Sequence, residues 1–174
     1  MSESLELMRE FVLESRLWKT AKTVPLFGAM LKVYIMQEGE SLPTQRQIEV
    51  LYSLNDLTDH VLKDIANHAL EYFRQVDAVV NLAGEGIVID ESRIECYFRF
   101  ESILIPELGE CETNYFFVSA DCDWEPEHGM EVLVGDGRVF YCGDHSSLPF
   151  SSVWKEVTSA PRERQEVLLR QAYS

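Results

Sequence analysis

Residues 130–142 read MEVLVGDGRVFYC, and this stretch decides the fold class. Apolar runs lie on both sides of residues 135–138, Gly-Asp-Gly-Arg. Asp-Gly is typical of a two-residue hairpin turn, because both central positions of such a turn take positive φ angles. The stretch therefore predicts an antiparallel hairpin whose paired residue numbers sum to about 273, a register that faces His128 towards His145.

Alternation with a period of two extends this β region towards the N-terminus. Every second residue is apolar between residues 94 and 100, residues 115–118 form another β-type run, and residues 31–35 alternate in the same way. A period of two is typical of strands that bury one face. With the hairpin, these segments predict a meander of about four strands preceded by one further strand.

Helical spacing of apolar residues predicts the other elements. Residues 1–22 contain apolar residues at helical intervals after Ser4, which predicts an N-terminal helix of about four turns. Residues 43–47, Pro-Thr-Gln-Arg-Gln, are typical of a helix start. The threonine side chain can bond a backbone N–H of the first turn, and the side chain of the second glutamine can bond the threonine N–H in return. The stripe continues to about Arg74 as one kinked helix or two helices in series, and residues 151–174 predict a C-terminal helical segment.

The order of these elements indicates one α+β domain. A chain of 174 residues with 46% apolar residues suffices for a single substantial core. We expect residues 1–174 to form a single domain, with residues 27–143 as its core, built as an antiparallel β-meander sheet packed on one face by helices.

The aromatic residues of the predicted strands occupy both faces. Tyr97, Phe98 and Phe100 lie in one strand, and Tyr115 to Phe117 lie in the next. Two explanations remain open: a core on one face with helix packing on the other, or a partner surface, for which Tyr and Phe are favoured anchors. A homo-oligomeric scaffold that uses these strands is therefore one functional hypothesis. The oligomeric state stays open.

The charge of the chain limits its partners. Thirty acidic residues against fifteen basic ones give a net charge of −15. Such a chain does not hold nucleic acid over a broad surface, because phosphate backbones are anionic. It attracts a cationic partner instead, for example a protein with a basic nucleic-acid-binding cleft. Solubility alone is an alternative explanation of the acidity.

The location of the protein is expected to be cytoplasmic. Residues 1–14 contain neither a basic n-region nor a continuous apolar h-region, and no apolar run is long enough to span a bilayer. Four cysteines, Cys96, Cys111, Cys122 and Cys142, are expected as reduced thiols in a chain without an export signal. We expect no association with a membrane.

The densest polar segment is residues 121–129, Asp-Cys-Asp-Trp-Glu-Pro-Glu-His-Gly. Four alternating carboxylates with one large aromatic residue are suited to contact a basic protein. The expected partner-binding patch, in which the tryptophan serves as the apolar anchor, consists of Asp121, Asp123, Trp124, Glu125 and Glu127.

A second hypothesis for the same region is a small metal-dependent hydrolase. The predicted register brings His128 and His145 to one end of the hairpin, where Asp144 or Asp123 completes a ligand set. The competing explanation is structural: one histidine packs on Trp124 and the other bonds a loop carbonyl.

Known cofactor motifs do not fit the chain. Pro126 and Val132 occupy the positions at which an EF-hand needs glycine and glutamate. The third glycine of a dinucleotide fingerprint falls at Ile89, and no Gly-x-Ser-x-Gly nucleophile elbow is present. No cofactor is predicted, and a binding protein is favoured over an enzyme.

Residues 123–129 resemble the Asp-Trp-x-x-Glu-His-Gly signature of an uncharacterised bacterial domain family, in which a Pro-Thr-x-x-Gln helix start such as that at residues 43–47 lies upstream. The resemblance covers roughly residues 27–143. Members of this family look like cytoplasmic proteins, and some are similar to immunity proteins that neutralise a bacterial toxin. The resemblance implies a binding protein that occludes a basic partner surface, and it implies no catalytic residues.

Overall fold

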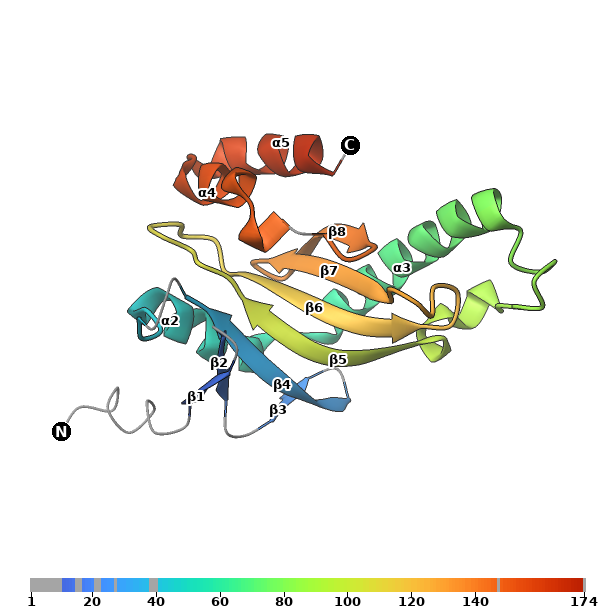
Figure 1. Cartoon of the computed structure of the whole chain (residues 1–174), viewed down its shortest axis with the longest axis horizontal. Helices are drawn as coiled ribbons and strands as arrows, with labels where there is room; N and C mark the ends of the chain where they lie inside the picture. Colours follow the sequence, from blue (N-terminus) through green and yellow to red (C-terminus); the bar gives the residue numbers. More distant parts are fainter. Residues whose placement is uncertain are drawn as a thin grey trace.

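A mixed β-sheet forms the centre of the molecule (Figure 1). The computed structural model describes residues 11–14, 17–20, 23–26, 28–37, 41–146 and 148–173. The described strands are β1 (Phe11–Glu14), β2 (Leu17–Thr20), β3 (Val24–Leu26), β4 (Ala29–Met36), β5 (Phe98–Ile105), β6 (Tyr115–Cys122), β7 (Met130–Gly135) and β8 (Arg138–Gly143). They follow the order β1-β2-β4-β5-β6-β7-β8, and β3 pairs with β4.

The helices of the described residues lie between β4 and β5 and after β8. They are α2 (Gln45–Ser53), α3 (Asp59–Val80), α4 (Ser152–Ser159) and α5 (Arg162–Ala172), with the short 3₁₀ helices η2 (Leu54–Asp56), η3 (Glu91–Cys96) and η4 (Leu148–Phe150). The expected start of α2 is confirmed: Thr44 caps the helix, and Gln47 Oε1 accepts a hydrogen bond from the Thr44 backbone N–H at 2.9 Å. The predicted α+β class, a mostly antiparallel sheet with helices packed against it, is confirmed.

The strands β5 to β8 form the antiparallel meander that the alternation predicts. The strand β4, in contrast, pairs with β5 in parallel, so the sheet is mixed. A parallel pair requires a crossover connection, and α2 and α3 provide it.

The hairpin turn also forms as expected. Asp136 and Gly137 take φ angles of 47° and 74°. The predicted register holds next to the turn, where Val134 pairs with Val139. A bulge between Leu133 and Val134 then shifts the pairing by one residue.

The prediction of a helix over residues 1–22 is wrong for the described part of that range. The strands β1 and β2 form an antiparallel pair, and β2 pairs with β4. Residues 1–10 lie outside the described residues. Short apolar runs fit either period, and here pairing with a distant strand decides between them.

Helices pack on both faces of the sheet, whereas the sequence predicted them on one face only. Successive residues of a strand point to opposite sides, and β6 carries large apolar side chains on both sides, so both faces need a cover. In Figure 1, α3 runs behind the sheet, and it contacts β8. On the opposite face, the Trp154 ring of α4 lies against Tyr115 and Phe117, with ring centroids 5.5 and 5.4 Å apart. The aromatic residues on both faces of β6 are therefore covered by helices, as the first of the two explanations expects.

Candidate functional site

The acidic segment of the sequence forms the connection between β6 and β7. Its backbone is held at both ends: the Asp123 N–H donates to the Tyr97 carbonyl at 2.9 Å, and the Gly129 N–H donates to the Glu125 carbonyl at 2.8 Å. Gly129 takes a φ angle of 68°, a conformation that side-chain-bearing residues rarely adopt. The connection is therefore a fixed turn.

Trp124 does not act as the predicted apolar anchor for a partner. Its side chain is only 1% exposed. The indole packs edge-on against Tyr72, Phe73 and Phe98, with centroid distances of 6.3, 6.0 and 6.4 Å. Trp124 thus joins the turn to α3 and β5 as part of the core, and we exclude it from the contact patch.

The carboxylates around Trp124 face solvent. Asp121, Asp123 and Glu127 are exposed, and Glu125 is half-buried. The nearest cation is Arg99 on β5, whose guanidinium lies 4.0 Å from the Asp121 carboxylate and 3.8 Å from that of Asp123. Arg99 was not among the predicted site residues, although the strand alternation places it on a solvent-facing position opposite Asp121.

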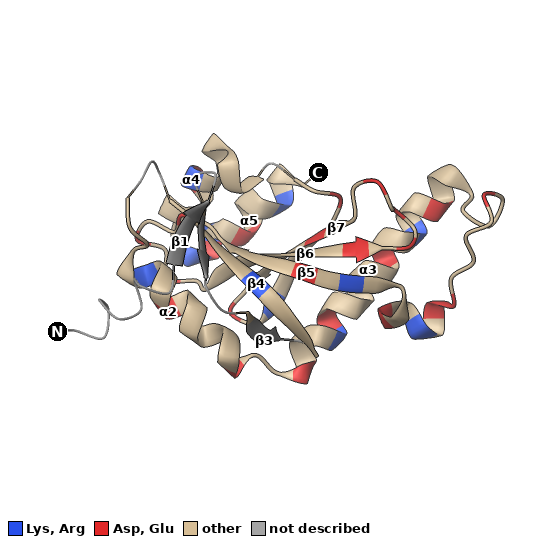
Figure 2. Ribbon diagram, turned by 60° about the horizontal axis from the view of Figure 1, so that its bottom comes forward, with Lys and Arg blue, Asp and Glu red and all other residues tan. Residues whose placement is uncertain are grey.

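Further carboxylates gather at the same end of the molecule. Figure 2 shows them in the loop after α3, in η3 and in the β6–β7 turn. An ion pair of 2.6 Å between Arg74 and Glu91 joins α3 to η3. We define the acidic end by its exposed or half-exposed carboxylates Glu85, Asp90, Glu91, Glu95, Asp121, Asp123, Glu125 and Glu127. The arginines among them are Arg74, Arg93 and Arg99.

The predicted metal corner does not assemble. His128 Nδ1 lies 3.2 Å from Glu125 Oε1, whereas His145 Nδ1 lies 3.5 Å from Glu131 Oε2. Asp144 accepts a hydrogen bond from the Tyr141 hydroxyl at 2.9 Å. Within the described ranges, no group of three or more His, Cys, Asp or Glu side chains is arranged to hold a metal ion. The ligand set required by the hydrolase hypothesis is therefore not formed by these residues.

Glu131 is a buried carboxylate that the sequence reasoning missed. It lies in β7 and is 5% exposed. Its Oε1 accepts hydrogen bonds from the Ser146 hydroxyl at 2.6 Å and the Ser146 N–H at 3.2 Å. A single carboxylate in an otherwise apolar strand is the signal that marks this position, because buried charges require partners. Glu131 fastens the segment after β8 to the sheet.

His145 makes the stability of this attachment depend on pH. The Glu131 carboxylate raises the pKa of His145 above its usual value. A group whose pKa is higher in the folded than in the unfolded state stabilises the fold while it is protonated. For His145 this stabilisation is complete below the unfolded pKa of about 6.5, and it is lost as the pH rises through the folded pKa. We expect it to be below about 1 kcal/mol, because the imidazole is half-exposed and screened by solvent.

The measurement is urea unfolding of the wild type and of His145→Gln between mildly acidic and mildly alkaline pH. The stability of the wild type should fall across this range relative to that of His145→Gln. His128→Gln, which keeps the His145–Glu131 pair, is the control and should follow the wild type. Parallel curves for the wild type and His145→Gln would contradict this role of His145.

Cys122 and Cys142 are not activated as nucleophiles. All four cysteines are free. Burial raises the pKa of Cys122 to about 12 and also raises the pKa of Cys142 well above its usual value. Both thiols are therefore protonated near neutral pH, and a protonated thiol is a weak nucleophile.

The fold and this site define an acidic α+β protein with a cluster of carboxylates at one end of a mixed sheet. Every helix in the described part of the chain is too short or too polar to cross a membrane. The chain belongs to a family described as Domain of unknown function (DUF6985), whose model matches residues 7–149. The family therefore extends beyond the expected residues 27–143 in both directions. No curated protein and no solved structure matches the chain.

Proposed function

We propose that this chain is a binding protein whose acidic end engages a basic surface of a protein partner. The observation that supports this function most is the concentration of charge around the β6–β7 turn. Residues 121–131 contain five carboxylates and neither lysine nor arginine. Three of these carboxylates, those of Asp121, Asp123 and Glu127, are exposed. Such a surface speeds the approach of a cationic partner and disfavours an anionic one.

The rigidity of the turn supports the same function. The buried Trp124 ring and the backbone bonds of Asp123 and Gly129 hold the turn in one conformation. A surface that is ordered before binding loses less conformational entropy when the partner associates. The acidic end therefore resembles a preformed half of an interface more than a loop that must order on contact.

The kind of partner follows from the charge and from the resemblance of residues 123–129 to a signature found among immunity-like proteins. Proteins that act on nucleic acid carry basic clefts, and a rigid acidic surface competes for such a cleft. We propose that the chain acts in this way as a toxin-immunity-like protein in the cytoplasm. The metal-dependent hydrolase is not carried forward, because His128 and His145 pair with different carboxylates.

The test begins with capture of the partner from a lysate of the source organism by the tagged chain at low and high salt. Binding of the isolated partner is then compared between the wild type and the triple variant Asp121→Asn, Asp123→Asn, Glu127→Gln. We expect the association rate constant of the triple variant to fall about tenfold and its salt dependence to weaken, because steering by exposed charges acts mainly on association.

The control carries the same change of net charge elsewhere: Glu110→Gln, Glu112→Gln, Glu156→Gln, three exposed residues outside the acidic end. This control should associate within about twofold of the wild type, because exposed charges beyond a Debye length are screened. Equal rates for the two triple variants, or an affinity that does not change with salt, would count against the proposed function.

A further inference from the structure

Two exposed valines continue the buried face of α3. Tyr72 and Phe73 are buried and contact Trp124 of the β6–β7 turn, with ring centroids 6.3 and 6.0 Å apart. Val79 and Val80 each follow seven residues later, so they lie on the same side of the helix and about 10 Å further along its axis. They are 85% and 49% exposed. The apolar stripe of α3 therefore runs past the acidic turn and ends in solvent.

The length of α3 explains this exposure. The helix has 22 residues and is about 33 Å long. The strand β6 has 8 residues and spans about 26 Å. Figure 1 shows that the C-terminal part of α3 extends beyond the sheet. Val79 and Val80, which we call the valine pair, lie on this projecting part.

The end of α3 is held in one conformation. The Asn81 N–H donates to the Asp77 carbonyl at 2.9 Å, and the Leu82 N–H donates to Asp77 Oδ1 at 2.9 Å. The loop then returns, because the Ile87 N–H donates to the Leu82 carbonyl at 2.9 Å. The valine pair is therefore preformed, which lowers the entropic cost of binding a partner.

Negative charge lies on both sides of the valine pair. On one side, the β6–β7 turn carries Asp123, Glu125 and Glu127 and packs on the same stripe of α3 through its tryptophan. On the other side, the last turn of α3 contains Asp77 and no basic residue. The C-terminal end of a helix has a partial negative charge that favours cations. The surface thus combines apolar contact with attraction for positive charge.

We propose that the valine pair is the apolar anchor of the acidic end and docks a basic amphipathic helix of the protein partner. This inference rests on the proposed function and specifies the partner. The apolar face of the partner helix packs on Val79 and Val80, and its lysines or arginines meet the carboxylates of the turn and the end of α3. A second copy of the chain is disfavoured, because it brings two acidic ends together.

The probes are two synthetic helical peptides of about eighteen residues with equal positive charge. One has leucines on one face and lysines on the other, and the second has alanine in place of leucine. Both are used below the concentration at which they self-associate, in NMR titrations of the ¹⁵N-labelled full chain. We expect the leucine–lysine peptide to bind about tenfold more tightly, because it buries more apolar surface. The amide shifts should lie at the end of α3 and in the β6–β7 turn.

Variants of the valine pair separate the apolar contact from the charge. The double variant Val79→Ser, Val80→Ser should bind the leucine–lysine peptide about tenfold more weakly than the wild type. It should bind the alanine–lysine peptide within about twofold of the wild type, which also shows that the fold is intact, since serine and valine have similar helix propensity. The triple variant of the acidic end should bind both peptides more weakly.

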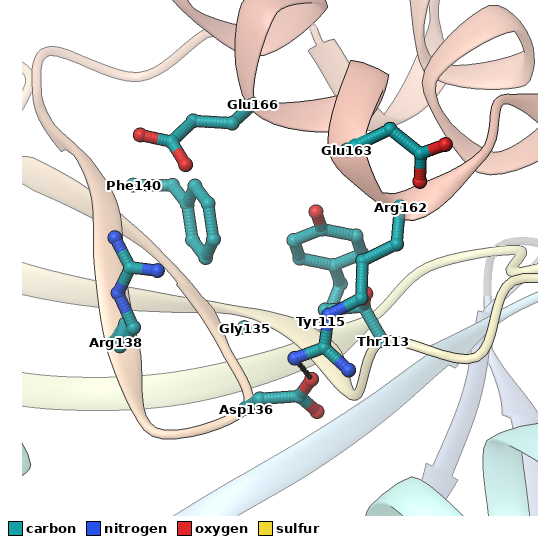
Figure 3. A pocket seen from close by; sticks show the side chains of 9 residues that line it. All are labelled: Thr113, Tyr115, Gly135, Asp136, Arg138, Phe140, Arg162, Glu163 and Glu166. Carbon is teal, nitrogen blue, oxygen red and sulfur yellow. Dashed lines mark hydrogen bonds and ion pairs between the residues drawn. The ribbon is translucent and has the colours of Figure 1, made fainter.

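The matched control is Val167→Ser on α5, where Val167 is 52% exposed. Glu163 and Glu166 of the same helix line, together with Arg138, a cavity of about 350 Å³ beside the β7–β8 hairpin (Figure 3). An exposed valine near carboxylates is thus present there too, so a peptide without preference for the valine pair also binds α5. Val167→Ser should bind the leucine–lysine peptide within about twofold of the wild type.

The inference is overturned if the two peptides bind equally, if the double variant binds the leucine–lysine peptide like the wild type, or if the amide shifts lie on α5. It is also overturned if the wild type sediments as a dimer that the double variant dissociates, because a second copy then covers the valine pair. A triple variant that binds both peptides like the wild type contradicts the proposed function instead, so the two failures are distinct.

Discussion

Trp124→Ala is expected to lower the free energy of unfolding by about 3–5 kcal/mol, the usual range for removal of a buried tryptophan. The indole is 1% exposed and contacts Tyr72 and Phe73 of α3 as well as Phe98 of β5. Its removal leaves a cavity between these three rings, and the helix cannot fully close it. Urea unfolding followed by tryptophan fluorescence and by circular dichroism measures the change.

The matched control for this prediction is Glu127→Ala in the same turn. Glu127 is exposed, so the substitution should change stability by less than about 0.5 kcal/mol. The two variants also separate stability from binding, because Glu127 belongs to the proposed contact surface and Trp124 does not. A Trp124→Ala protein of wild-type stability that no longer binds the partner would contradict the structural role assigned to Trp124.

Gly129→Ala is expected to destabilise the fold by roughly 3 kcal/mol, a large effect for the addition of one methyl group. The φ angle of 68° costs a non-glycine residue roughly 1–2 kcal/mol. In addition, a Cβ at this position lies 2.6 Å from the carbonyl oxygen of Ala120. That oxygen belongs to β6, so relief of the clash requires the strand or the turn to shift. The measurement is again equilibrium unfolding in urea.

Gly86→Ala isolates the backbone part of this effect. Gly86 has a φ angle of 85°, but a Cβ there meets no atom within 4 Å. Its substitution should therefore cost only the roughly 1–2 kcal/mol of the left-handed conformation. If Gly129→Ala proves no more destabilising than Gly86→Ala, the close approach to Ala120 does not constrain the turn.

These two predictions divide the residues of the Asp-Trp-x-x-Glu-His-Gly signature into two groups. Trp124 and Gly129 are buried and shape the turn. Asp123 and Glu127 are exposed and carry charge, and His128 is exposed as well. The signature thus combines a structural part, which holds the turn against α3, with a charged part that the turn presents to solvent. Only the second group is available to contact a partner.

Local sequence patterns specify the features that depend on neighbouring residues. The hairpin turn at Asp136 and Gly137 and the helix start at Thr44 were predicted correctly, because each depends on residues within a few positions. The N-terminal region was predicted wrongly, because its strands depend on pairing between β2 and β4. Burial of Trp124 was missed for a similar reason, since the indole is covered by a helix about fifty residues earlier in the chain.

The sequence by itself determined the α+β class, the hairpin, the cap of α2 and the acidity of residues 121–131, since charge and short-range backbone preferences belong to the local chain. Only the tertiary structure decided which of those carboxylates face solvent, which carboxylate each histidine meets, and how Arg138 and Glu163 come to line one cavity. The bulge beside Val134 shifts the hairpin register, and α5 packs against β8. Both arise from contacts between elements, which local periodicity does not encode.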